Sequence, residues 1–588
     1  MRLENVGVKV LLEGYRLFSH AFTTDDEHQK LIALDRNNNI ALIETSESQK
    51  AAEVKKINTK ELGERIVNII SQGFNSKPFP ILVTVKRDDM PTVFDNYLCD
   101  FESEDIPSTP VFTSNSTPMI ITNPKNLKPV ILFTNGSKLV YGEIQNESEF
   151  VELGSLKPSS VPIGVHTSSY LDVTSDMNAD LVLHTKKDGK NAILILQLKF
   201  TTSLDDKKSF KFEFEEIQTM EIDEDEIGPI MFTEMASKTR PDMLFISRKG
   251  NEYTLNLYKN ISYKDEPDNA LKDLQRLKEF YREAENLEVY HNASKIVYPL
   301  KEILADTKSN VQSRKIILSE DGIPRGMFLY DPFGKGIKSV YIVTDEIDAQ
   351  KNKPANSIIQ VIEFDRAEGR FNFKIDNPEW ENDQKLGFVV GLTVFDCEDK
   401  GIEQLMVNTI SVDGDGSYSF KLINSDHNLE MTGIYLLPLS IADSQTNFIP
   451  GACFVLVYEN EEKIIKTSLS FQSSYPSLQR HKVFVGLEQT NLFINHFTLK
   501  VPGSDENKNQ YDAPTFLVPN TFAVFTFDQR DWNIQSFFTN RYYNQTVVSL
   551  FVVLFAFIII YVVLSIQDKK KYKTVMNRDS MRRVFNAL

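Results

Sequence analysis

The chain has 588 residues, too many for one hydrophobic core, so two or three domains or one large repeat structure are expected. Its formal net charge of −17 argues against nucleic-acid binding, because an acidic surface repels phosphate. The three cysteines, Cys99, Cys397 and Cys453, allow at most one disulfide. We interpret them as small buried apolar residues.

Short β-runs separated by tight turns dominate the first part of the chain. Gly and Asn at these turns accept the positive φ that hairpin turns need. The predicted hairpins span residues 31–44, 128–144, 180–200 and 242–260, with turns at Arg36–Asn39, Asn135-Gly136, Asp188-Gly189 and Lys249-Gly250.

These hairpins recur inside a longer unit, in which a short strand ends in an acidic residue and a loop of about seven residues leads to the hairpin. Its spacing of roughly 60–90 residues exceeds that of typical propeller repeats, so insertions or degenerate blades are expected. One insertion, residues 266–290, has helical spacing and is predicted to be a helix packed on the domain. The acidic strands are 170–172, 230–234, 328–331 and 392–396.

A second β-rich block follows residue 425, where the repeating unit stops. About six short strands lie 8–15 residues apart between residues 433 and 529. This spacing is typical of a β-sandwich. The predicted fold class is therefore all-β: a degenerate β-propeller over residues 1–425, then a C2- or Ig-like sandwich over residues 430–530.

A membrane-spanning helix is predicted at residues 547–566, where no residue is charged. At about 1.5 Å per residue, these residues span a hydrocarbon core of about 30 Å. Seven basic residues follow within residues 567–588. The positive-inside rule makes this segment a cytoplasmic tail and predicts a single-pass type I protein. The expected location is the plasma membrane, or the endoplasmic reticulum and secretory pathway.

A bulk outside the cytosol normally requires a signal peptide, and residues 1–18 contain no uninterrupted apolar run. We therefore expect the true start to precede this sequence. The alternative is a tail-anchored protein with a cytosolic bulk. Glycosylation sequons all precede the helix, and they begin at Asn115, Asn135, Asn146, Asn260, Asn292 and Asn544.

The acidic strand, loop and hairpin unit resembles the FG-GAP repeat of integrin-α-type propellers. The C-terminal third resembles one family in particular, the T-cell immunomodulatory protein family, whose members are described as integrin-α FG-GAP repeat-containing. The segments that carry this resemblance run in order: Pro450-Gly451, Gln472-Ser473-Ser474-Tyr475, Val485-Gly486-Leu487, Asn491-Leu492-Phe493, Phe497-Thr498-Leu499, Val518-Pro519-Asn520, Trp532 and Arg583–Leu588. The family tends to have Gly where this chain has Glu488.

FG-GAP loops bind Ca²⁺ when they supply oxygen ligands at alternate positions. Only one loop keeps three acids in this register, and the predicted metal ligands are Asp172, Asp176 and Asp180. Met177 replaces the glycine of the tight turn. The alternative is that these acids cap the turn by accepting hydrogen bonds from backbone N–H groups. No other cofactor is expected.

The sequence contains none of the phosphate-loop, nucleophile-elbow or zinc-protease motifs, and its eight histidines are scattered. We therefore predict a non-catalytic protein. The resemblance implies an adhesion- or immunomodulator-like surface protein whose propeller binds another protein. Two alternatives stay open. One is a luminal propeller hydrolase that uses a carboxylate pair at the propeller centre on glycans. The other is an endoplasmic-reticulum folding or trafficking factor.

Overall fold

The computed structural model divides the chain into two units, Met1–Phe537 and Phe538–Leu588. It describes residues 7–587, apart from a set of loops and single positions. The residues not described are 21–29, 46–50, 60–61, 63–65, 72–79, 104, 146–148, 201–211, 238, 263–287, 306–313, 321–322, 332–333, 335, 337, 349–352, 374–385, 396–403, 412–416, 425–432, 443–444, 459–462, 474–480, 488–493, 504–509, 514–516, 529–530, 539–542 and 586.

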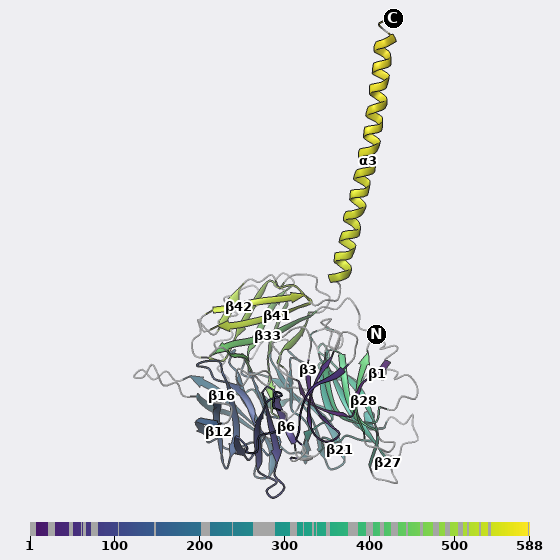
Figure 1. Ribbon diagram of the computed structural model, residues 1–588. Helices are drawn as coiled ribbons and strands as arrows, with labels where there is room; N and C mark the ends of the chain where they lie inside the picture. Colours follow the sequence, from purple (N-terminus) through teal and green to yellow (C-terminus); the bar gives the residue numbers. More distant parts are fainter. Residues whose placement is uncertain are drawn as a thin grey trace, which may run out of the picture. The chain divides into compact units, whose positions relative to one another are not determined.

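The first unit contains seven antiparallel sheets that form the blades of a propeller (Figure 1). The strands of the first three blades follow chain order. Blade 1 is β2 (Tyr15–His20), β3 (Lys30–Asp35), β4 (Ile40–Thr45) and β5 (Ala51–Ile57). Blade 2 is β6 (Ile66–Ser71), β7 (Ile81–Lys86), β8 (Phe94–Cys99) and β9 (Phe112–Ser114). Blade 3 is β10 (Met119–Thr122), β11 (Pro129–Asn135), β12 (Lys138–Gln145) and β13 (Glu149–Leu156).

Blades 4 to 6 repeat this arrangement with short additional strands. Blade 4 is β14 (Ser169–Leu171), β15 (Asp180–Lys187), β16 (Lys190–Phe200) and β17 (Phe212–Ile222). Blade 5 is β19 (Met231–Thr233), β20 (Asp242–Lys249), β21 (Glu252–Asn260) and β22 (Tyr290–Pro299), with β18 (Glu226–Ile227). Blade 6 is β26 (Met327–Tyr330), β27 (Ser339–Asp348), β28 (Lys353–Asp365) and β29 (Arg370–Phe373), with β23 (Arg314–Lys315). The short elements α2 (Lys301–Ala305), β24 (Ser319–Glu320) and β25 (Ile323–Pro324) lie between blades 5 and 6 in the sequence.

Blade 7 closes the ring with a strand from the other end of the propeller sequence. It contains β30 (Phe388–Phe395), β31 (Gln404–Ile410), β32 (Tyr418–Asn424) and β1 (Gly7–Glu13). β1 pairs antiparallel with β32, so the first described residues and the last blade share one sheet. Pairing across the closure ties the two ends of the propeller together.

The predicted hairpin turns are confirmed. Asn38, Gly136, Gly189 and Gly250 have φ values of 60°, 62°, 81° and 61°. Space is open around the three glycines, so the left-handed backbone of the turn, rather than crowding, explains the residue type. The helix predicted for residues 266–290 falls almost entirely outside the described residues, and its last residue, Tyr290, begins β22.

The second β block is a sandwich of two sheets. One sheet has the order β34-β33-β41-β42, with β38 also paired to β33, and the other has the order β36-β35-β39-β40. Phe454, Phe497 and Phe525 pack between the sheets, and the rings of Phe497 and Phe525 stack with centroids 4.6 Å apart. The strands are β33 (Gly433–Ala442), β34 (Gln445–Phe448), β35 (Cys453–Tyr458), β36 (Lys463–Ser468), β38 (Val483–Gly486), β39 (His496–Lys500), β40 (Gln510–Ala513), β41 (Thr521–Asp528) and β42 (Asp531–Phe538).

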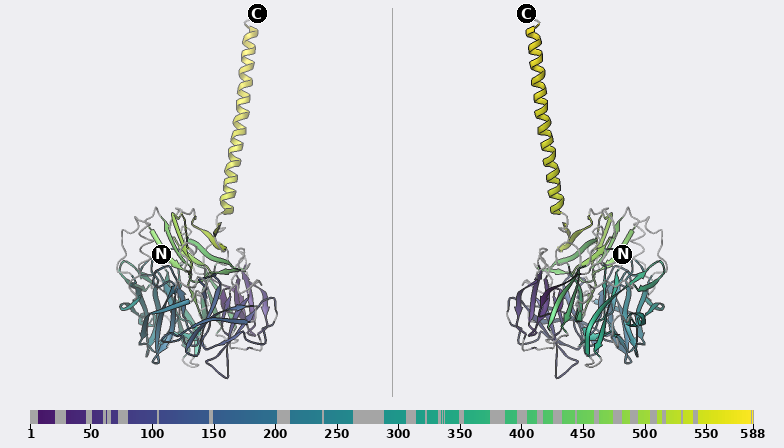
Figure 2. Two further views of the ribbon diagram at one scale, coloured as in Figure 1. Left: turned by 90° about the vertical axis from the view of Figure 1, so that its left-hand side faces the viewer. Right: turned by 90° about the vertical axis from the view of Figure 1, so that its right-hand side faces the viewer.

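The sandwich and the propeller share one hydrophobic core. Leu127 and Leu181 of the propeller belong to the same buried cluster as Leu436 and Phe454 of the sandwich. The three views show the sandwich strands β33, β41 and β42 over one face of the ring of blades (Figures 1 and 2). At the joint, a Cβ on Gly451 would lie 2.5 Å from Ala179 Cβ, so only glycine allows this approach.

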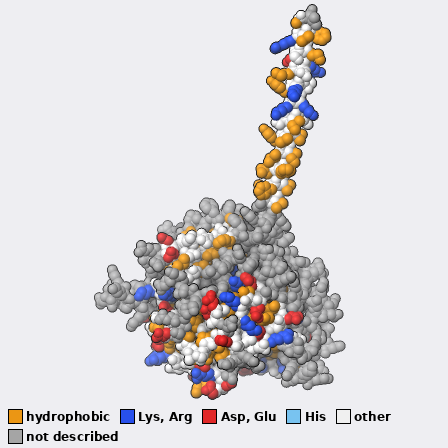
Figure 3. Space-filling model, in the orientation of Figure 1, with side chains coloured by type: hydrophobic (Ala, Val, Ile, Leu, Met, Phe, Trp, Pro, Cys, Tyr) orange, Lys and Arg blue, Asp and Glu red, His pale blue; other side chains and the backbone are white. Residues whose placement is uncertain are grey.

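The second unit is the helix α3 (Tyr543–Phe585), which is long and apolar enough to cross a membrane over part of its length. Figure 3 shows apolar side chains along its N-terminal half and basic side chains toward its C-terminal end. The helix continues well beyond the apolar residues 547–566, so the basic segment is helical as far as Phe585. The predicted all-β fold class with one terminal apolar helix is confirmed.

Candidate functional site

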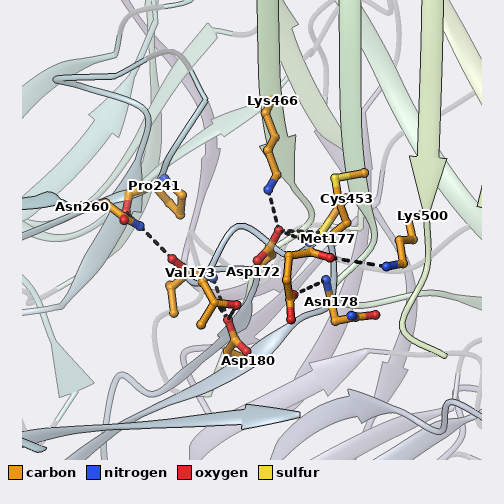
Figure 4. A network of polar contacts seen from close by, with 12 residues as sticks. Asp172, Val173, Met177, Asn178, Asp180, Pro241, Asn260, Cys453, Lys466 and Lys500 are labelled. Carbon is orange, nitrogen blue, oxygen red and sulfur yellow. Dashed lines mark hydrogen bonds and ion pairs between the residues drawn. The ribbon is translucent and has the colours of Figure 1, made fainter. Parts of the chain in front are cut away.

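The acidic loop of blade 4, residues 172–180, connects β14 to β15 (Figure 4). Asp180 is fully buried, and its Oδ2 accepts hydrogen bonds from the backbone N–H groups of Val173 at 3.0 Å and Thr174 at 2.9 Å. Asp172 Oδ2 accepts one from Met177 N at 2.9 Å. Both acids therefore accept hydrogen bonds from backbone N–H groups of the turn, which is the alternative to metal binding given above.

Met177 has a φ of 66°, a left-handed conformation that glycine would adopt more easily. Its side chain is buried against Cys453 and Val455 of β35 in the sandwich. Contact with the sandwich thus compensates for the strain of a larger residue at this position. The contact between the two domains therefore explains why Met177 stands at the position that is glycine in the repeat.

Two lysines of the sandwich contact the same loop (Figure 4). Lys466 Nζ, on β36, lies 2.7 Å from Asp172 Oδ2, and both side chains are almost fully buried. Lys500 Nζ, on β39, donates a hydrogen bond to the backbone carbonyl of Asp176 at 3.3 Å. Neither lysine was predicted, because both lie about 300 residues from the loop and no local pattern marks them.

The loop holds more buried negative charge than a hydrogen-bonded turn needs. Burial raises the pKa of Asp176, and the charge of Asp172 raises it further. Burial, together with the charges of Asp176 and Asp172, also raises the pKa of Asp180 well above its usual value. Three oxygens, Asp172 Oδ1, Asp180 Oδ1 and Gln197 Oε1, are buried and accept no hydrogen bond from the described residues.

Within the part of the chain that the structure describes, no three His, Cys, Asp or Glu side chains converge closely enough to hold a metal ion. The ammonium group of Lys466 instead lies against Asp172. Ca²⁺ at Asp172, Asp176 and Asp180 stays a prediction. The buried oxygens without a partner are of a type that a hard cation prefers, and Lys466 supplies a positive charge to the same loop.

A strand of the sandwich sequence enters the blade 4 sheet. β37 (Phe471–Gln472) pairs antiparallel with β14, the first strand of that blade, on the side away from β15. Gln472 Nε2 donates hydrogen bonds to Ser169 Oγ at 2.6 Å and to the carbonyl of Ile230. Since the first strand of each blade lines the propeller axis, β37 occupies the central channel.

Two residues that follow β37 in the sequence also contact inner residues of the propeller. Ser473 Oγ lies 2.8 Å from His166 Nδ1, and His481 Nε2 lies 2.7 Å from the carbonyl of Ser71 in blade 2. Burial lowers the pKa of His166 to about 3 and that of His481 to about 4, so both are neutral at pH 7. One segment of the sandwich therefore contacts inner residues of blades 2, 4 and 5.

The predicted glycosylation sites differ in accessibility. Asn135 and Asn292 are exposed, whereas Asn115 is half-buried and its amide binds the carbonyl of Thr92. Asn260 is 4 % exposed, and its amide donates to the carbonyls of Val173 and Pro241. The side chain of Asn260 is therefore not accessible to a glycan in this fold, and glycosylation at the other sequons stays a prediction. Asn146 and the side chain of Asn544 lie outside the described residues.

Cys99 and Cys453 are buried and not in a disulfide, in agreement with the interpretation as apolar residues. Burial raises the pKa of both thiols. Cys397 lies outside the described residues.

A propeller joined to a β-sandwich and followed by one candidate membrane helix defines a class of membrane-anchored propeller proteins. Residues 446–537 match the family model of the ITFG1 C2 domain. This match confirms the resemblance derived from the sequence, and it shows that residues 446–537 are similar to the C2 domain of that family. The sandwich is therefore a C2 domain, and its first strand, β33, precedes the matched residues.

No curated protein matches the chain. Solved structures similar to it include a Bacteroides uniformis protein provisionally described as a 6-phosphogluconolactonase, with 11 % identity, a TM-score of 0.31, and coverage of 61 % of this chain and 83 % of that one. The WD40 domain of SCAP from fission yeast has 7 % identity, a TM-score of 0.28, and coverage of 71 % and 98 %. The six-bladed lectin of Aleuria aurantia has 9 % identity, a TM-score of 0.27, and coverage of 62 % of this chain and 98 % of that one. At these TM-scores the likenesses support no further argument.

Proposed function

We propose that this protein is a non-catalytic, single-pass membrane protein whose propeller binds another protein. The observation that carries the proposal is the occupied central channel. The alternative of a glycan hydrolase needs a carboxylate pair that faces an open propeller centre, and β37 with Gln472 and Ser473 takes up that space. A partner therefore binds the outside of the propeller.

The most suitable surface is the rim opposite the C2 domain. In an antiparallel blade, the connections of the first and second strands lie at one end and the central hairpin turns at the other. The first set contacts the C2 domain through Leu127 in blade 3, where Ser440 Oγ donates to its carbonyl at 2.9 Å, and through Asp172 in blade 4. The hairpin turns at Asn135-Gly136, Asp188-Gly189 and Lys249-Gly250 form the opposite rim and are exposed.

A partner bound at this rim would contact turns of several blades at once, because each blade contributes one hairpin. Met90, in the β7–β8 connection, is an apolar side chain with 51 % of its surface exposed on this rim. Lys187 and Lys190 flank the corresponding turn of blade 4, two blades further round the ring. We propose that Met90 is an apolar anchor for the partner and that the two lysines add charged contacts elsewhere on the same rim.

The test compares two full-length variants in detergent. We expect Met90→Glu with Lys190→Glu to lose a saturable protein partner that the wild-type chain retains from membranes. Leu153→Glu, on the outer strand β13 and also about half exposed, should retain it as the matched control. A panel of glycosidase and phosphatase substrates should show no turnover. Saturable turnover, or equal binding by both variants, would contradict the proposal.

The topology is a separate proposal, which rests on the basic residues that follow the apolar segment. In sealed microsomes, added protease should remove only the segment after residue 566 and leave the propeller and the C2 domain protected. Digestion of the propeller would instead indicate a tail-anchored protein with a cytosolic bulk.

A further inference from the structure

The joint between the propeller and the C2 domain contains a charge arrangement that the proposed function does not use. Asp172 and Asp180 are at most 1 % exposed, and Asp176 lies between them in the same nine-residue loop. Burying a carboxylate is costly unless an opposite charge or several hydrogen-bond donors compensate it. The compensation for Asp180 comes from backbone N–H groups, whereas Asp172 has Met177 N and the ammonium group of Lys466.

We propose that Lys466 of the C2 domain holds the place of a bound cation in the acidic loop of blade 4 and thereby locks the C2 domain onto the propeller. The ammonium group comes from β36, in the other domain, and the Lys466 side chain is 3 % exposed. Lys500 reaches the backbone carbonyl of Asp176 from β39 of the same sheet. The loop and its counter-charge therefore belong to different domains, so separating the domains would leave buried carboxylates uncompensated.

The oxygens around the loop are those that a hard cation prefers. Asp172 Oδ1, Asp180 Oδ1 and Gln197 Oε1 are carboxyl and amide oxygens, and none has a hydrogen-bond partner among the described residues. Gln197 Nε2 donates a hydrogen bond to Asp176 Oδ2 at 3.0 Å, and Gln197 Oε1 takes no part in that bond. Without the ammonium group of Lys466, the buried carboxyl groups of the loop lose their positive counter-charge, and an added divalent cation could replace it.

The proposal predicts a gain of metal dependence. Full-length Lys466→Ala in detergent should unfold several degrees below the wild-type chain, and 5 mM CaCl₂ should restore most of that loss. The wild-type chain should shift by less than about 1 °C with the same addition, since ligand stabilisation requires an available site. Lys463→Ala, on the same strand, should behave as the wild-type chain does. Terbium luminescence should report binding to Lys466→Ala only.

A double variant distinguishes the loss of the Lys466–Asp172 ion pair from a general loss of folding. Lys466→Met with Asp172→Asn removes both charges together, so it should recover much of the unfolding temperature without Ca²⁺ and should not respond to Ca²⁺. If Lys466→Ala is too unstable to purify, the double variant and Lys466→Arg, which retains the charge, provide the comparison. The proposal is overturned if folded Lys466→Ala ignores Ca²⁺, or if the double variant is no more stable than Lys466→Ala.

Discussion

The acidic loops of blades 4 and 5 have the same turn but are closed by different cations. In blade 5, Asp242 Oδ2 accepts hydrogen bonds from the N–H groups of Met235 and Ala236, the residues seven and six positions earlier. In blade 4, Asp180 Oδ2 accepts hydrogen bonds from the N–H groups of Val173 and Thr174, which again lie seven and six positions earlier in the sequence. The aspartate that begins the second strand therefore shapes both loops in the same way.

The outer contacts of the two loops differ. Arg366, just after β28 of blade 6, donates hydrogen bonds to the carbonyls of Glu234 and Met235 in the blade 5 loop. The blade 4 loop is held by Lys466 of the C2 domain instead. A guanidinium from the next blade stiffens the ring, whereas an ammonium from the C2 domain joins two domains. The comparison shows that one local turn can serve either purpose, depending on the neighbour that covers it.

The largest effect is expected from removing the shared cap. Asp242→Ala leaves the N–H groups of Met235, Ala236 and Asn260 without their acceptor, at a cost of about 3–5 kcal/mol in the free energy of unfolding. Asp180→Ala should cost less, because it also removes one of three clustered negative charges. Asp89→Ala, at an exposed position, should change stability by less than about 0.5 kcal/mol. Thermal unfolding of the full-length variants measures the order, and a greater loss for Asp180→Ala would contradict it.

The blade 5 loop should also make the stability of the protein depend on pH. Burial raises the pKa of Asp242 to about 6, despite three backbone hydrogen bonds that lower it. The folded state therefore binds the proton more tightly than the unfolded state, in which the pKa is about 4. Its contribution to stability, up to about 3 kcal/mol, is present at low pH and is lost as the pH rises from about 4 through 6. The stability difference between the wild-type chain and Asp242→Asn should fall across this range, and a constant difference would refute the assignment.

A smaller effect is expected for the arginine that closes the blade 5 loop. Arg366→Ala should reduce stability by about 2 kcal/mol, because it removes hydrogen bonds from a charged donor to two carbonyls. Arg370→Ala removes only an exposed ion pair with Glu368 and should cost less than about 1 kcal/mol. Neither change should create the response to Ca²⁺ that is expected of Lys466→Ala. A Ca²⁺ response in Arg366→Ala would show that the two closures are not distinct.

The smallest effect is expected from chelation of the wild-type protein. EDTA should lower its unfolding temperature by no more than about 2 °C, because a single weak site stabilises only in proportion to RT ln(1 + [L]/Kd). If a site does exist, Asp176→Ala should abolish the response. A drop of more than about 10 °C would mean that metal, and not Lys466, supports this part of the structure.

Features encoded within a short stretch of chain were predictable. The hairpin turns follow from Gly and Asn at positions with positive φ, and the apolar helix follows from twenty consecutive uncharged residues. The role of Asp180 as an acceptor for backbone N–H groups was predictable as the alternative to a metal ligand, since its donors lie only six and seven residues away. The accessibility of Asn260 was not predictable, because its burial depends on packing between blades 4 and 5.

The sequence alone determined the strand and turn units, the sandwich, the apolar terminal helix and the resemblance to the C2 domain, because each depends on periodicity, turn chemistry or an ordered set of short matches. Only the tertiary structure decided that β1 closes blade 7, that β37 fills the channel and that Lys466 meets Asp172. These contacts join residues about 300–400 positions apart in the chain. Their free energy comes from burial and charge compensation between complete domains, for which no local pattern of residues is required.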